Sequence, residues 1–180
     1  MRNIFIGFLL VLLDFNLNLN QCSVDLLPDF VGYIILVNGF HELEQESSYF
    51  IKVRPYSIGM AVYTGILFVL DLFGASLNLS GLDFILGIIA IVALFYIAYC
   101  IVQGVKEMEA SHGAFLNGDK LNSLWKWWAI FTAVAYVLML IPSLSIVCTI
   151  ISLISAIAFL IAINTSKNLY YDMKNGKYKS

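Results

Sequence analysis

The sequence predicts an all-α, polytopic membrane protein with six helices, and three observations support this fold class. First, 61% of the 180 residues are hydrophobic and 12% are charged, whereas soluble domains average about 45–50% and about 25%. Second, six apolar runs follow one another along the chain. Third, all ten Lys and Arg residues lie at or near the N-terminus, the second and fourth connections or the tail, which is one side of a six-span topology. At roughly 20 residues per span, six spans leave no room for a soluble catalytic domain.

The expected spans are the apolar runs themselves, within a single transmembrane domain over residues 1–180. They cover residues 3–19, 30–43, 56–73, 82–102, 124–141 and 144–163. We expect residues 103–123 to form a cytoplasmic loop and residues 164–180 a cytoplasmic tail. Pro142 separates the last two spans, because proline removes a backbone donor and clashes with the preceding turn.

The distribution of cations predicts how the chain is oriented in the membrane. Lys and Arg occur at the N-terminus, around the second and fourth connections and in the tail, and the other connections contain none. Short loops rich in Lys and Arg stay on the cytoplasmic side of a membrane. We therefore expect both termini to lie in the cytoplasm.

The first hairpin departs from the pattern of full-length spans. A helix over residues 30–43 would be about 21 Å long, against about 30 Å of hydrocarbon. After Asp14, moreover, Asn16, Asn18 and Asn20 alternate with apolar residues. This period of two indicates extended backbone, not helix. The sequence leaves open whether the first hairpin fully crosses the bilayer.

Similar pieces of sequence recur, which indicates three in-out-in hairpin repeats. An Asp-Phe pair followed closely by glycine begins the second run at residues 29–32 and the fourth run at residues 83–87. A third copy, which ends near residue 169, lacks the acids. If the repeats are real, they share one orientation, and their pseudo-axis follows the membrane normal.

Four acidic residues lie at the ends of apolar runs. Asp29 and Asp83 stand at N-terminal ends, where a carboxylate complements the helix dipole, and we expect structural helix caps there. Asp14 and Asp71 lie near C-terminal ends, where the dipole disfavours a carboxylate. Because intramembrane acids often face a cavity, Asp14 and Asp71 are candidates for a ligand or ion path. The alternative is that both helices end there in the wet interface.

Glycines mark the expected helix-packing surfaces. Gly32 and Gly39 are seven residues apart, which places them on one face of the second span, two turns from each other. Small residues let membrane helices approach closely, so we expect this face to pack against a neighbouring helix. Gly59 and Gly65 supply further small surfaces on the third span.

The sequence contains no signature of catalysis or of a cofactor. His41-Glu42 begins an H-E-x-x-H pattern, but Gln45 stands where the second histidine would be. The three cysteines are scattered over the expected topology, so we expect neither a disulfide nor a thiolate metal site. We therefore predict no catalytic residue, no metal, no cofactor and no nucleic-acid partner.

One segment resembles a known group of proteins. The stretch Leu26-Leu27-Pro28-Asp29-Phe30-Val31-Gly32-Tyr33-Ile34, with the downstream Gly39 and Glu42-Leu43, is similar to small polytopic membrane proteins of low-GC Gram-positive bacteria. The resemblance covers mainly the first 55 residues, and this group has no known activity. It implies that the chain lies in a bacterial plasma (inner) membrane.

Two classes of function fit these observations. The first is a non-enzymatic structural or accessory component of a membrane complex, whose partners are the lipid bilayer and either another membrane protein or further copies of this chain. The second is a small transporter or channel, in which Asp14 and Asp71 line an outward-facing acidic cavity for a cation or polar solute. Convergence of the two acids on one polar cavity would favour transport. Acids that point toward the lipid headgroups would favour the first class.

Overall fold

The computed structural model describes residues 1–12, 16–19, 22–25, 28–73, 82–138 and 142–176. Within these ranges the predicted all-α class is confirmed, with one short β-hairpin in addition. The elements in chain order are α1 (Arg2–Leu12), β1 (Asn16–Leu19), β2 (Cys22–Asp25), α2 (Asp29–Glu42), α3 (Ser48–Leu72), α4 (Leu82–His112), α5 (Gly118–Val137) and α6 (Pro142–Lys174). They form two compact units, Met1–Ile97 and Ala98–Ser180, and α4 contributes to both.

Three helices of the described chain are long and apolar enough to cross a membrane. They are the parts of α3, α4 and α6 at Ser48–Leu70, Ile85–His112 and Ser143–Lys174. These helices give the chain the character of a membrane protein. Helices α1 and α2 have 11 and 14 residues, so they are roughly 16 and 21 Å long, less than the ~30 Å of a hydrocarbon core. The prediction of six crossings goes beyond these three spans and stays a prediction.

Two segments expected to be a loop and a tail are largely helical, so the predicted bounds were wrong there. Helix α4 continues to His112, and only residues 113–117 of the expected loop 103–123 connect it to α5. Helix α6 likewise continues to Lys174, through most of the expected tail. The physical reason is that polar residues end an apolar run without ending a helix, and neither segment contains proline. Both helices are followed closely by a glycine of positive φ, Gly113 at +59° and Gly176 at +66°.

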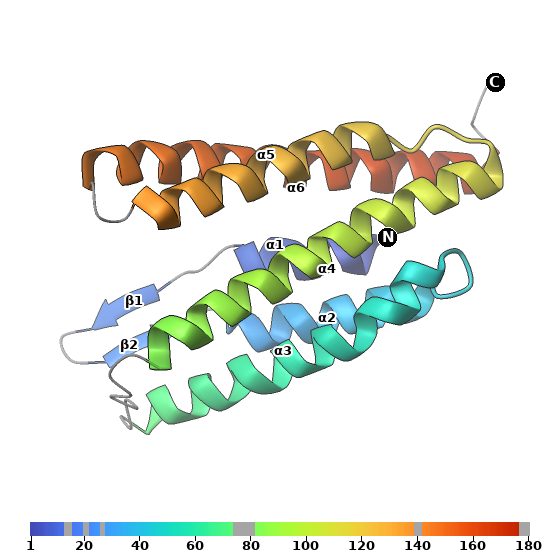
Figure 1. The fold of residues 1–180 in the computed structure, drawn as a ribbon. Helices are drawn as coiled ribbons and strands as arrows, with labels where there is room; N and C mark the ends of the chain where they lie inside the picture. The colour runs from blue at the N-terminus through green and yellow to red at the C-terminus, as the bar shows by residue number, and fades with distance from the viewer. Residues whose placement is uncertain (13–15, 20–21, 26–27, 74–81, 139–141, 177–180) are drawn as a thin grey trace. The chain divides into compact units, whose positions relative to one another are not determined.

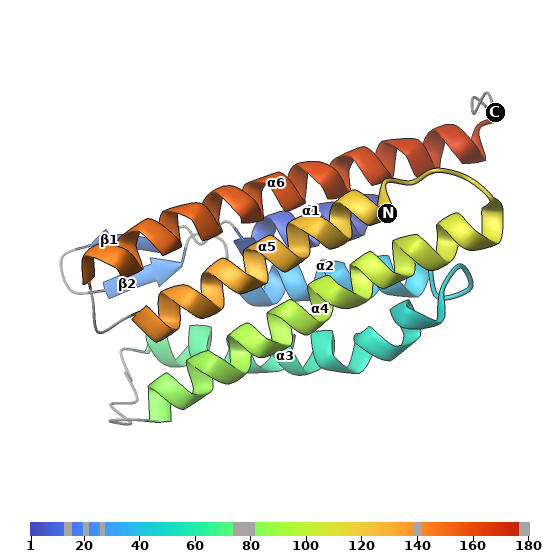
Figure 2. The ribbon, with the colours of Figure 1, turned by 45° about the horizontal axis from the view of Figure 1, so that its top comes forward.

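In the first unit, α2 packs antiparallel to α1 and also contacts α3, as Figures 1 and 2 show. Phe8 on α1, Leu36 and Phe40 on α2, and Phe50 on α3 are fully buried. Two aromatic pairs join α2 to α3. The ring centroids of Phe40 and Phe50 are 5.9 Å apart, and those of Phe30 and Phe68 are 5.5 Å apart.

In the sequence, the β-hairpin follows α1 and precedes α2. Strand β1 pairs antiparallel with β2, with Asn16 opposite Asp25 and Leu19 opposite Cys22. The extended backbone predicted from the period of two is therefore present over Asn16–Leu19. Strand pairing satisfies backbone N–H and C=O groups, which are costly to leave without a hydrogen bond within a membrane.

In the second unit, α5 and α6 form an antiparallel hairpin (Figure 2). The hydroxyls of Thr132 and Ser152 lie 2.6 Å apart, and the hydroxyl of Ser145 donates to the carbonyl of Ala135 at 3.2 Å. Such Ser and Thr hydrogen bonds join helices in an apolar environment.

The connection between α4 and α5 is also held by polar contacts. The Glu109 carboxylate accepts hydrogen bonds from the backbone N–H groups of Leu116, at 2.6 Å, and Gly118, at 3.0 Å. Lys106 forms an ion pair with Asp119 at 2.8 Å. The hydrogen bond from Lys106, together with its charge, lowers the pKa of Asp119. The chain turns at Asn117, whose φ of +72° is left-handed.

Candidate functional site

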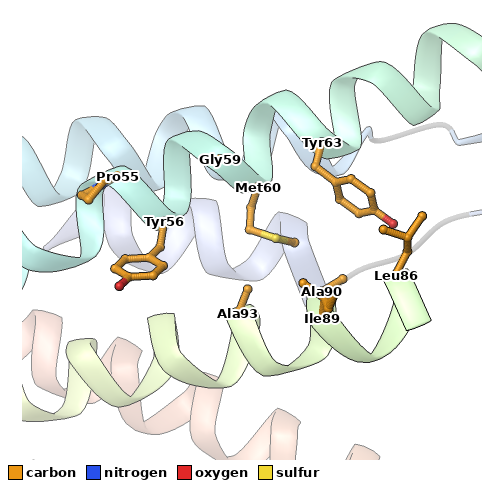
Figure 3. A pocket seen from close by; sticks show the side chains of 9 residues that line it. All are labelled: Pro55, Tyr56, Gly59, Met60, Tyr63, Leu86, Ile89, Ala90 and Ala93. Atoms are coloured by element: carbon orange, nitrogen blue, oxygen red, sulfur yellow. The ribbon is translucent and has the colours of Figure 1, made fainter. Parts of the chain in front are cut away.

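A cavity of about 510 Å³ lies between α3 and the first part of α4, within the first unit (Figure 3). Nine residues line it: Pro55, Tyr56, Gly59, Met60 and Tyr63 from α3, and Leu86, Ile89, Ala90 and Ala93 from α4. All nine belong to the candidate membrane spans of these two helices. The volume is within the range of about 300–1,000 Å³ that is typical of ligand pockets.

Small residues form part of the lining of this space. Gly59, Ala90 and Ala93 contribute little side-chain volume where the two helices face one another (Figure 3). A Cβ atom added to Gly59 would meet no atom within 4 Å. The glycine therefore opens into the cavity and is not covered by a neighbouring helix.

Tyrosines mark both ends of the cavity. The ring of Tyr56 contacts that of Tyr96 at a centroid distance of 4.6 Å, which bridges α3 and α4. At the other end, the ring of Tyr63 extends toward Leu86 (Figure 3). The remaining lining side chains are hydrocarbon or thioether, so the two tyrosine hydroxyls are the polar groups of the lining. This composition suits a long apolar group.

A polar cluster lies near the N-terminal part of α3. One carboxylate oxygen of Glu44 accepts from Nη1 of Arg54 at 2.7 Å and lies 3.0 Å from Nδ1 of His41. The hydrogen bond with His41, and then the charges of His41 and Arg54, lower the pKa of Glu44 although partial desolvation opposes the shift. The cluster ties the end of α2 to α3, and it matches the charge of Arg54 with a carboxylate.

The structure leaves the predicted ion path untested. Asp14 lies outside the described residues, and Asp71 is in the last turn of α3 with a side chain that is also outside the description. Asp29 is the first residue of α2, where its charge complements the helix dipole. Pro28 occupies the N-cap position and makes no side-chain cap hydrogen bond. Asp83 is the second residue of α4, and its side chain too is outside the description.

Gly32 and Gly39 face α1. A Cβ atom added to Gly32 would lie 2.7 Å from a methyl group of Val11 and 2.9 Å from the carbonyl oxygen of Gly7, and one added to Gly39 would lie 2.7 Å from the backbone nitrogen of Ile4. The neighbour of this glycine face is thus the first helix. Gly7 completes the contact, and sequence reasoning missed it, although it is the one glycine of the first apolar run.

The glycines of α3 differ from the expectation that both serve helix packing. Gly65 has ordinary contact with Phe30, whose Cβ atom would be 3.7 Å from an added Cβ, while Gly59 faces open space. A glycine that permits close approach and one that leaves a cavity look the same in a single sequence. The small residues Ala90 and Ala93 on the facing helix were the available signal for the cavity.

The described residues contain no group of three or more His, Cys, Asp or Glu side chains that could hold a metal ion. None of the nine residues that line the cavity has a side chain of these types. The lining is mostly apolar, with the hydroxyls of Tyr56 and Tyr63 as its polar side-chain groups, and this composition supports binding of an apolar molecule.

Comparisons of this chain with protein families, curated proteins and solved structures found no match. The resemblance of residues 26–34 to membrane proteins of low-GC Gram-positive bacteria accordingly stays a prediction.

Proposed function

We propose that the chain is a non-enzymatic accessory component of a membrane complex. The observation that carries this proposal is the composition of the α3–α4 cavity, whose lining has no carboxylate, imidazole, thiol or amine. These groups are the ones that act most often in general acid–base and nucleophilic catalysis, and the polar side-chain groups of this lining are the two tyrosine hydroxyls. A membrane-embedded cavity without them is suited to holding an apolar group in place.

The proposal includes six crossings of a bacterial plasma membrane, with both termini in the cytoplasm. The one-sided Lys and Arg residues support this orientation. Helices α4 and α6 have 31 and 33 residues, so they are roughly 46 and 50 Å long and exceed the ~30 Å of hydrocarbon. Their polar C-terminal parts would extend into the cytoplasm, on the side that carries the cations.

An exposed apolar face of α6 supports the proposal that the chain has a protein partner. Five β-branched residues at spacings of three and four are each more than half exposed: Val147, Ile150, Ile154, Ile157 and Ile161. The α5–α6 hairpin instead uses the opposite face of α6, with Ser152 bonded to Thr132 and Phe159 against Trp128. In a membrane such a face contacts either lipid or another helix. We place the partner's contact on this face.

Photocrosslinking tests this function directly. A crosslinking residue in place of Ile154 should capture a companion membrane protein or a second copy of the chain, and the same complex should survive purification at a constant ratio in two mild detergents. A crosslinking residue in place of Ser152 is the matched control, because it should react within the chain, with α5. A chain that is monomeric in both detergents, and that gives no protein crosslink at residue 154, would exclude the accessory function.

A further inference from the structure

We infer that the α3–α4 cavity binds one acyl chain of an anionic phospholipid, with the lipid phosphate at Lys52. This site goes beyond the accessory function and does not depend on it.

Lys52 lies in line with the cavity on α3. It precedes Pro55, Tyr56, Gly59 and Tyr63 by three, four, seven and eleven residues. At 3.6 residues per turn these positions share one helical face, and Lys52 and Gly59 are almost directly above one another. The ammonium group of an exposed Lys52 is therefore about one turn beyond the Tyr56 end of the cavity.

The charge at that end complements a phosphate. Arg54 is paired with Glu44, whereas Lys52 makes no ion pair with the residues that the structure describes. The ammonium of Lys52 lies over the ring of Tyr49, 5.1 Å from its centroid. Lys and Tyr side chains are typical of the level of the headgroups, where lysine attracts anionic lipids. The cavity behind this cation contains no acidic side chain that would repel the headgroup.

The shape and lining of the cavity suit an acyl chain. On α3 the lining runs from Pro55 to Tyr63, a length of about 12 Å at 1.5 Å per residue. Apart from the two tyrosine hydroxyls, its side chains are hydrocarbon or thioether. An extended hydrocarbon chain would run past the ring of Tyr56 and along Gly59 and Ala90 toward Leu86.

The structure provides a variant that fills the cavity and a matched control. Because a Cβ atom on Gly59 meets no atom within 4 Å, Gly59→Leu should place its side chain in the cavity. Gly87→Leu makes the same change in α4, where an added Cβ also meets nothing within 4 Å, and Gly87 is not part of the lining. Both changes replace a glycine within a helix by a good helix former. Ala93→Leu is a second filling variant, which enters the cavity from α4.

Native mass spectrometry of the full chain, with dioleoyl phosphatidylglycerol and dioleoyl phosphatidylcholine as probes, measures the site. Wild type and Gly87→Leu should each retain one phosphatidylglycerol in preference to phosphatidylcholine. Gly59→Leu and Ala93→Leu should weaken retention by roughly tenfold or more, since this corresponds to the loss of about two buried methylene groups. Lys52→Gln should lower the affinity for phosphatidylglycerol by about fivefold, toward that for phosphatidylcholine.

Three results would overturn the inference. The first is that wild type and both filling variants retain phosphatidylglycerol equally. The second is that wild type binds the two lipids with equal affinity. The third is that the filling variants lose a bound polypeptide and not a lipid. Melting curves of all variants verify that they are folded. The lipid assay changes residues of α3 and α4, whereas the crosslinking experiment changes residue 154 of α6. A negative result in one experiment therefore leaves the other proposal standing.

Discussion

Glycine has two opposite uses in the first unit. At Gly32 and Gly39 the missing side chain allows α1 and α2 to touch through their backbones, while at Gly59 it leaves space. Gly32→Leu should therefore lower the thermal midpoint in detergent, because the new side chain must displace Val11 and the backbone at Gly7. Overpacking of this kind costs typically about 1–3 kcal/mol. Gly87→Leu should leave the midpoint unchanged or raise it. Equal midpoints for Gly32→Leu and wild type would mean that α2 does not use this face against α1.

The Glu44 cluster predicts a pH dependence of stability. The pKa of Glu44 is lower in the folded chain than its ordinary value of 4.5, so its contribution to stability is fully present above that value and is lost as the pH falls through the lowered pKa. Glu44→Gln should melt below wild type at neutral pH, and the two should converge as the pH drops below 4.5. Melting curves in detergent between acidic and neutral pH measure the difference. A constant gap over this range would show that the carboxylate charge is not responsible.

The acids near the ends of the spans separate the accessory function from transport. The accessory function predicts that vesicles containing wild type, Asp14→Asn or Asp71→Asn show the same background cation flux under an imposed gradient. Asp83→Asn, at the start of α4, should affect stability alone, by about 0.5–2 kcal/mol if it caps the helix. A flux that wild type and Asp83→Asn support, and that Asp14→Asn or Asp71→Asn abolishes, would contradict the account and favour an ion path.

At the scale of elements, one carboxylate holds the junction of α4 and α5. Glu109→Ala removes the acceptor for the N–H groups of Leu116 and Gly118, and hydrogen bonds to charged groups are worth about 1.5–3 kcal/mol each. We expect a clear loss of thermal stability and faster hydrogen exchange at residues 116–118. Lys120→Ala, an exposed change on α5, is the control. If both variants melt alike, the junction does not depend on Glu109.

Hydropathy predicted where the helices lie better than where they end. The apolar runs located α3, α4 and α6, but α4 and α6 continue through polar residues that are themselves good helix formers. The period of two predicted extended backbone at Asn16–Leu19. Its partner strand Cys22–Asp25 was missed, because a short strand is defined by pairing more than by its own pattern. The cavity depends on the spacing of α3 and α4, which no local pattern specifies.

At the scale of the whole chain, the sequence carries information on orientation that packing alone does not supply. Positive residues select the cytoplasmic side because they resist transfer across the membrane during insertion. The three long apolar helices agree with a membrane location. The proposed orientation would place Lys52 in the leaflet that is rich in anionic lipids.

Cysteine accessibility at two sites tests this orientation most directly. In a chain whose native cysteines are replaced, Asn78→Cys, in the third connection, should react with a membrane-impermeant maleimide in intact cells. Lys177→Cys, in the tail, should react only after the membrane is permeabilised. Labelling of Lys177→Cys from outside intact cells would contradict the cytoplasmic assignment of the tail, and with it the placement of Lys52 in the inner leaflet.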